Sequence, residues 1–312
     1  MTAFNSTPTL ADTTSPAVAI RARLAPCVLH PALAQVFPLL LALADDETAS
    51  ASISVARALA DCKGAVPTVV RALGDMRAAE VAVSPLAGAS LEEFFGPEYA
   101  SACRDSVEMQ LAVAAGPIDW ACEITDQSPI DAIVSLAHQL RAGLIVMGLR
   151  HHGVLRRAIS RDLLSEVLRV TRVPVLAVKA DLTSLPKRVV VAIDFGQASL
   201  HAAALARHLL AADGSLFLVH VAPVDSNGVR AQLDALLDDL VPAPGMTMSS
   251  IVLHGDVQSS IENLAHMVSA DLLAVGSARH SLHDRLATAS ISMKLAHTAR
   301  WSTLVVPSHQ GD

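Results

Sequence analysis

The chain has 312 residues, a formal net charge of −7 and 52% hydrophobic residues. Its length predicts two domains, and the 17% charged and 3% aromatic residues predict cores of Ala, Leu, Val and Ile, as in layered α/β folds. The negative charge and the lack of Lys or Arg runs argue against a nucleic-acid partner. The four cysteines form no Cys-x-x-Cys pair, which predicts a reduced cytoplasmic chain without a metal or redox site.

The N-terminal part is predicted to contain neither a membrane span nor a signal peptide. Residues 24–44 carry no charge, but three prolines, His30 and Gln35 would kink a spanning helix and bring polar groups into lipid. Residues 1–32 are therefore expected to form a disordered or extended lead-in. The apolar run that follows is expected to be a buried strand.

Strands and helices alternate in the first half, although less regularly than in the second. Buried strands are expected as continuous apolar runs, because both faces of a parallel sheet are covered by helices. The first half is predicted to contain a helix at 48–64 and strands at 36–46, 65–73, 118–126, 143–148 and 174–178.

Residues from about 76 to 110 make the first half longer than the second, and this segment is interpreted as an insertion. Phe94, Phe95 and Tyr99 cluster in it, although the chain has few aromatic residues. Packing of an inserted helix is the favoured interpretation. A lid over a crevice or a contact with the other domain is the alternative.

The second half shows the alternation of strands and helices more clearly. Short β-branched runs are separated by stretches with helical spacing of apolar residues. This half is predicted to contain strands at 188–194, 215–223, 248–256, 271–277 and 302–308 and helices at 199–213, 229–240, 257–270 and 292–300.

The two halves are copies of one domain. An ungapped overlay of the segments that begin at Ile133 and Ile261 matches Gly148 with Gly276, and the register is kept to the last strand of each half. A repeat of this length, with the same order of elements, predicts a duplicated domain rather than a solenoid.

The expected fold is α/β, with two doubly wound parallel five-stranded sheets in tandem. The domains are placed at 33–179 and 188–312, and the polar residues 180–187 form the linker between them. Right-handed crossovers leave a ligand crevice beyond the carboxyl ends of the strands. Asp194 and Gly276 fall at such strand ends.

The order of elements and the ending of each half resemble the universal stress protein family. Residues 144–178 contain a strand, Met-Gly, a loop, a helix and Pro-Val-Leu-Ala-Val, and residues 271–308 end the second half similarly. The resemblance implies a tandem universal stress protein with two domains like those of the adenine nucleotide α-hydrolases, which are Rossmann-like. It also suggests a pseudo-dimer of the two halves through residues 174–178 and 302–306, and it leaves a homodimer of chains open.

Nucleotide-binding members of this family carry a glycine loop after the fourth strand, an Asp after the first strand and a Val at the end of the second. In such loops backbone N–H groups and a helix N-terminus hold phosphate oxygens. The resemblance therefore implies ATP or another adenine nucleotide in the second half, with Mg²⁺ expected only together with the nucleotide. Arg279 and Ala289 replace the second and third loop glycines. The implied nucleotide-binding residues are Asp194, Val221, Gly276, Ser277, Arg279, Ser290 and Ser292.

The first half keeps only the first loop glycine, and a carboxylate replaces the loop hydroxyl, where it would repel phosphate. The acid after the first strand is Asp45 or Asp46, and Ala72 stands where the Val is expected. This half is expected not to bind ATP. Its degenerate site consists of Asp45, Gly148, His151, Arg161 and Asp162.

Other chemistry has weaker support in the sequence. The chain contains no Gly-x-Ser-x-Gly elbow, P-loop or Gly-x-Gly-x-x-Gly turn, its paired loop histidines lack a second ligand cluster, and Asp194 has no evident catalytic partner. The sequence therefore predicts a non-catalytic, cytoplasmic stress-response or regulatory protein. A nucleotide-independent interaction module of the same fold and a slow ATP hydrolase are the alternatives.

Overall fold

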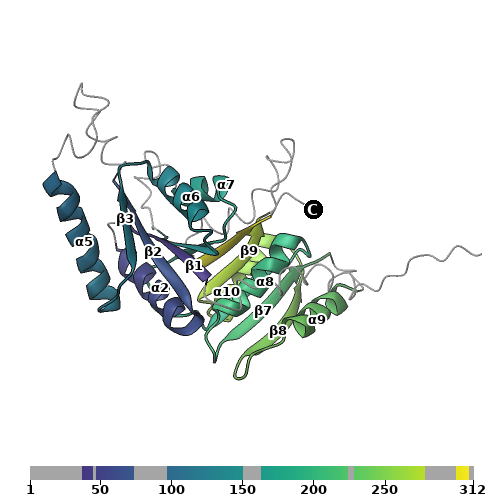
Figure 1. Ribbon diagram of the computed structural model, residues 1–312. Coiled ribbons are helices and arrows are strands. Elements are labelled where there is room, and N and C mark those ends of the chain that lie inside the picture. The colour runs from purple at the N-terminus through teal and green to yellow at the C-terminus, as the bar shows by residue number, and fades with distance from the viewer. Residues whose placement is uncertain are drawn as a thin grey trace, which may run out of the picture.

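Ten strands form one continuous sheet in the order β3-β2-β1-β4-β5-β10-β9-β6-β7-β8 (Figure 1). Every neighbouring pair is parallel except β5 and β10, which are antiparallel. Two parallel five-stranded sheets are thus joined edge to edge, which confirms the predicted fold class. The structure is a computed structural model, and it describes residues 37–44, 47–73, 97–149, 163–223, 228–277 and 300–308.

The first half contains the five strands that the sequence predicts. Each of the first four strands is followed by a crossover segment that returns the chain to the same end of the sheet, as parallel pairing requires. The elements are β1 (Phe37–Ala42), α2 (Ala49–Lys63), β2 (Ala65–Ala72), α5 (Pro97–Ala115), β3 (Ala121–Thr125), α6 (Pro129–Gln139), β4 (Leu144–Gly148), α7 (Leu163–Val170) and β5 (Val175–Val178).

Helix α5 changes the interpretation of the predicted insertion. It connects β2 to β3 in the same way that a helix of the second half connects the corresponding strands, so residues 97–110 belong to the regular βαβ pattern. Residues 74–96, with Phe94 and Phe95, lie outside the described residues, as does the side chain of Tyr99.

The second half repeats the same order of elements over the residues that are described up to β9, and it ends in β10. Helix α9 spans the residues that the sequence predicts, and the predicted helix at 292–300 falls, apart from Arg300, outside the described residues. The elements are β6 (Arg188–Ala192), α8 (Gln197–Leu209), β7 (Ser215–Val221), α9 (Val229–Leu240), β8 (Thr247–Leu253), α10 (Val257–Met267), β9 (Leu272–Ser277) and β10 (Ser302–Pro307).

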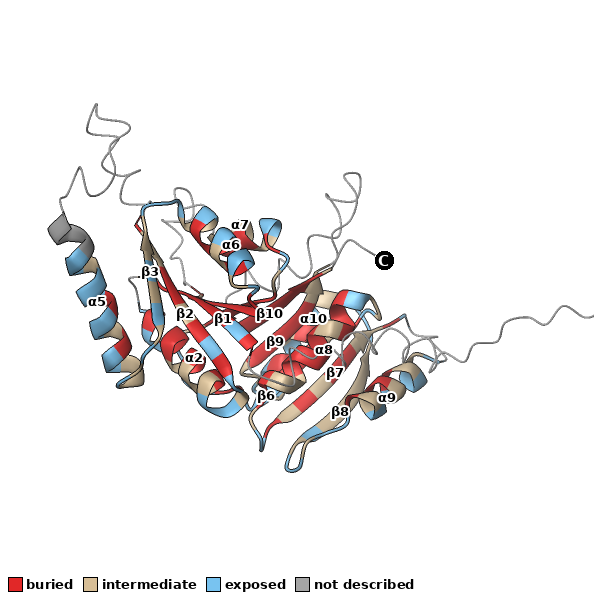
Figure 2. Cartoon of the chain, in the orientation of Figure 1, coloured by how far each residue is buried: buried red, intermediate tan, exposed pale blue. Residues whose placement is uncertain are grey.

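Helices cover both faces of the sheet. Helices α2, α5, α8 and α9 bury their apolar side chains against one face, and α6, α7 and α10 bury theirs against the other. Successive strand residues alternate between the two cores, as Val189 and Val190 do. This double burial, red along the central strands in Figure 2, explains why the strands read as unbroken apolar runs.

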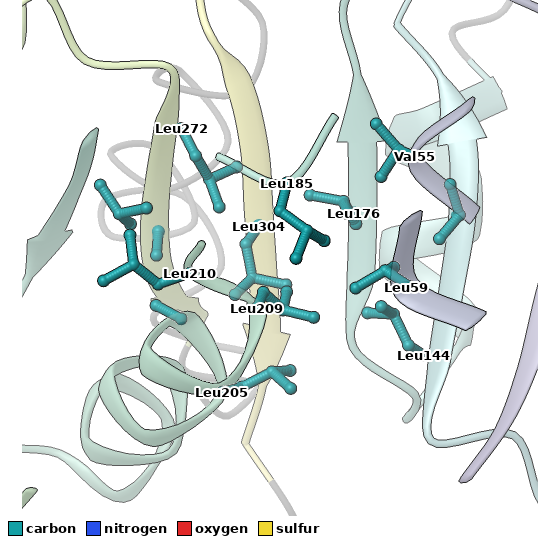
Figure 3. Packing of buried hydrophobic residues seen from close by; sticks show 14 of the residues in the cluster. Val55, Leu59, Leu144, Leu176, Leu185, Leu205, Leu209, Leu210, Leu272 and Leu304 are labelled. Carbon is teal, nitrogen blue, oxygen red and sulfur yellow. The ribbon is translucent and has the colours of Figure 1, made fainter. Parts of the chain in front are cut away.

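The two halves meet along β5 and β10, where Leu176 pairs with Leu304. The linker takes part in this contact, because Leu182 and Leu185 are each only 8% exposed. Both leucines belong to one buried cluster with residues of α2, α8 and the two central strands (Figure 3). The linker is therefore part of the core between the halves rather than a free connection.

The apolar segment before Asp45 ends in the buried strand β1, as predicted. Across the residues that the structure describes, none of the helices is both long enough and apolar enough to span a bilayer.

Candidate functional site

The strand order reverses between β6 and β9 in the second half, because the chain runs from β6 outward to β7 and β8 and then returns to β9. In doubly wound sheets ligands bind at such a switch point, beyond the carboxyl ends of the strands. The register pairs Ala192 with both Val275 and Val219. Two residues further along, Ser277, Asp194 and Val221 therefore stand side by side at this edge.

Asp194 is exposed and holds the turn between β6 and α8. Its Oδ1 accepts a hydrogen bond from Gly196 N–H (2.8 Å) and another from the Ser199 hydroxyl (2.5 Å). Ser199, buried in the first turn of α8, also accepts the Asp194 N–H at 3.2 Å. These bonds stabilise the turn that leads from β6 into α8, and the bond from Gly196 N–H to Asp194 Oδ1 is an Asx-turn. They use Oδ1 and leave Oδ2 outside this turn.

Phe195 has a left-handed backbone conformation, with φ of 62°. This is uncommon for a bulky side chain, and such strain clusters at functional sites. Its ring lies against the His220 ring, with centroids 5.0 Å apart. His220 Nδ1 is 2.6 Å from Ile193 O. Because that carbonyl can only accept, Nδ1 carries the proton, and in the neutral ring Nε2 is left as an acceptor.

Gly276 is required by close packing rather than by an unusual backbone angle. A Cβ on this residue would lie 2.6 Å from Ala198 C and 2.8 Å from Ser199 Cα, both backbone atoms of the first turn of α8. Its φ is outside the left-handed region, so Gly276 does not supply the positive φ that the resemblance implies for loop glycines. The glycine therefore lets β9 and α8 approach one another beside Asp194.

The same positions in the first half carry different side chains. The register pairs Leu39 with Leu144 as it pairs Val189 with Leu272, so Ala44 occupies the position of Asp194. By the same reasoning Arg71 corresponds to His220 and Ala72 to Val221. Arg71 directs a guanidinium nitrogen to Leu43 O at 3.5 Å, as His220 contacts Ile193 O. The switch point of the first half thus has no carboxylate at the position that Asp194 fills.

The structure brings together four of the predicted site residues, Asp194, Val221, Gly276 and Ser277, and it places Gly148 at the corresponding point of the first half. A Cβ on Gly148 would meet the side chain of Thr48, the residue before α2. The other predicted residues lie outside the described residues: Arg279, Ser290, Ser292, Asp45, His151, Arg161 and Asp162.

Sequence reasoning missed Ser199 and Phe195. The spacing Asp-x-Gly-x-x-Ser from Asp194 to Ser199 is a helix-start signal that points to the serine. No sequence pattern marks the left-handed conformation of Phe195. Among the described residues, His, Cys, Asp and Glu side chains form no group of three or more that could hold a metal ion.

The tandem doubly wound fold, with a switch point where the strand order reverses, defines a class of α/β ligand-binding folds. Residues 38–179 and 186–307 both match the sequence model of the universal stress protein family. The chain therefore belongs to the universal stress protein family, with two such domains in tandem, as the resemblance implies.

Solved structures share this architecture. A universal stress protein from Archaeoglobus fulgidus is 18% identical with a TM-score of 0.63, over 88% of this chain and 98% of that one. A putative universal stress protein from Pseudomonas aeruginosa is 16% identical with a TM-score of 0.53, over 87% and 93%. A functionally unknown protein from Pseudomonas aeruginosa is 14% identical with the same TM-score, over 87% and 92%. The sequence matches no curated protein.

Proposed function

We propose that the protein is a non-catalytic stress-response or regulatory protein whose second half binds ATP or another adenine nucleotide. One observation carries the proposal: Asp194, Val221 and Ser277 stand side by side at the carboxyl ends of three neighbouring strands, where the strand order reverses. Ligands of doubly wound sheets bind at this place. Family membership adds to it, because Asp194 and Val221 match positions of the nucleotide motif that the sequence resembles.

Each residue has a role in the proposed complex. Asp194 is exposed and its Oδ2 takes no part in the turn before α8, so this oxygen is available to accept hydrogen bonds from ribose hydroxyl groups. The adenine would lie beside the end of β7 at Val221. Ser277 begins the loop toward the phosphates, for which Arg279, Ser290 and Ser292 are proposed ligands. Mg²⁺ would arrive with the phosphates.

The first half is proposed not to bind nucleotide. Ala44 offers no carboxylate for a ribose, and Ala72 replaces the valine. Arg71 brings a guanidinium to the strand end where the second half has an imidazole. The proposal therefore predicts one nucleotide per chain.

A second function is favoured by a specific observation. Asp194 holds the turn before α8 and Gly276 is explained by packing, so both residues have structural roles without any ligand. These roles support the nucleotide-independent alternative, an interaction module that works through dimerisation or other protein contacts. The two proposals differ in whether Asp194 matters for binding.

Calorimetric titration with ATP, AMP and a non-hydrolysable ATP analogue tests the proposal. Wild type should bind one ATP per chain. Asp194→Asn should bind about 10- to 100-fold more weakly, because a hydrogen bond to a charged group is lost. Asp126→Asn is the matched control, since Asp126 is an exposed carboxylate at the same edge of the first half, and it should bind like wild type.

Absence of heat in wild type would favour the interaction module. Equal binding of ATP by wild type and Asp194→Asn would contradict the proposed role of the Asp194 carboxylate. Phosphate release is measured in parallel. Release above background that disappears in the Asp194 variant would contradict the non-catalytic assignment and support the slow hydrolase.

A further inference from the structure

His208 lies at the joint between the two halves, in the last turn of α8. Its ring packs edge-on against Phe37 of β1, with centroids 5.7 Å apart and planes inclined at 65°. Phe37 is fully buried and belongs to the first half. His208 Nε2 is also buried, and it has no hydrogen-bond partner. An ionisable ring therefore forms part of the apolar contact between the halves.

Positive charges surround this ring. Lys63, at the C-terminus of α2, reaches across the joint and donates from Nζ to Leu210 O at 2.8 Å. Arg207 precedes His208 on α8 and donates from Nε to Val241 O at 2.8 Å. Both cations use carbonyl oxygens at helix ends rather than carboxylates for these bonds, so their charges are not cancelled there.

The other elements at the joint add little compensating charge. The side chain that β1 presents is the apolar Phe37. On α2, Cys62 lies close enough to Lys63 to affect its pKa. The linker contacts the segment just after α8, where Ala211 N–H donates a hydrogen bond to Pro186 O at 2.9 Å. At the end of the linker, exposed Lys187 is already paired with Asp213 at 2.8 Å.

Protonation of His208 would be costly in this environment. A neutral imidazole can leave a lone pair at Nε2, but an imidazolium carries N–H groups at both ring nitrogens. The cation would therefore place a donor at Nε2 without an acceptor, next to two other cations. Burial, then Lys63 and Arg207, lower the pKa of His208 below its usual 6.5. These effects outweigh the stabilisation that the negative, C-terminal end of the α8 dipole gives to a protonated histidine.

We propose that His208 makes the joint between the two halves sensitive to acid, so that protonation of its ring loosens the packing of α8 against β1 and of β10 against β5. The sign follows from the direction of the pKa shift. A histidine with a lowered pKa contributes its full stabilisation above about pH 6.5, and this is lost as the pH falls through the folded-state value. Each unit by which the pKa of His208 is lowered corresponds to up to a tenfold loss of protection against hydrogen exchange.

Hydrogen exchange at pH 7.5 and pH 5.5, corrected for intrinsic rates, tests the proposal on wild type, His208→Gln and His266→Gln. His266 is the matched control because it lies in the last turn of α10 but is exposed. In wild type and His266→Gln, protection of Val175–Val178 and Ser302–Pro307 should fall on acidification. In His208→Gln it should fall less, and β7 should respond alike in all three proteins.

An NMR titration of the wild-type histidine rings provides a second measurement that does not depend on the folding of a variant. His208 should titrate below 6.5. Titration at or above 6.5 would overturn the proposal, as would the same exchange response in all three proteins. A loss of protection that is uniform across the ten strands would also overturn it, because the effect would not belong to the joint.

Discussion

Replacing Gly276 with Ala should destabilise the protein by about 3 kcal/mol. The new Cβ would lie 2.6 Å from Ala198 C, about 0.8 Å short of the 3.4 Å at which ordinary contact begins. Helix α8 cannot retreat freely, because Leu200, Leu205 and Leu209 on it are at most 1% exposed. Overpacking costs about 1 to 3 kcal/mol, and a clash with backbone belongs at the upper end.

Urea unfolding followed by circular dichroism measures this cost, and Gly148→Ala provides the comparison. There the new Cβ would meet the side chain of Thr48, including its Cβ at 2.7 Å. A second change, Thr48→Gly, removes those atoms and should restore most of the stability. Ser199→Gly should not rescue Gly276→Ala, because the obstacle is backbone. If Gly276→Ala lies within about 0.5 kcal/mol of wild type, the close approach of β9 and α8 is wrong.

Two further predictions concern the linker and the start of the second half. Leu185→Ala should lower the free energy of unfolding by about 2 to 4 kcal/mol in the same assay, because Leu185 is buried between the halves. Thr183 is exposed, and Thr183→Ala should change the free energy of unfolding by less than about 0.5 kcal/mol. Equal effects of the two changes would show that the linker is not packed. Asp271→Ala should cost about 1 to 2 kcal/mol, since Asp271 Oδ2 accepts the N–H groups of Lys187 (2.8 Å) and Arg188 (2.9 Å). Unchanged exchange at those two amides would argue against that role.

Most of the described fold could be predicted from sequence, because burial on both faces leaves a strong pattern. Val189, Val190 and Val191 are all fully buried, so β6 reads as an unbroken apolar run. Helix α5 was interpreted as an inserted helix rather than as part of the regular pattern, because it covers an edge of the sheet. Val107 and Leu111 are buried on it, but Met109 is 68% and Val113 82% exposed, and this weakens the helical pattern.

The site could be predicted only in part. The predicted strands put Asp194 and Val221 at the carboxyl ends of neighbouring strands, as the structure does, but whether they bind a ligand stays a prediction. The correspondence of Ala44 with Asp194 depends on strand register, which the sequence before α2 does not reveal. The sequence also could not show why a glycine occupies position 276, since close packing and phosphate binding both favour a glycine there. The contact of His208 with Phe37 joins residues of different halves, and no sequence pattern predicts that these two rings meet.

Hydrogen exchange of wild type with and without ATP tests the central proposal, nucleotide binding at the switch point of the second half. ATP should slow exchange at residues 193–199 and at His220 and Val221, which line the carboxyl ends of β6 and β7. The corresponding first-half residues 43–44 and 71–72 should be unchanged. Equal protection in both halves, or no protection at Asp194 when ATP saturates the protein, would contradict the account.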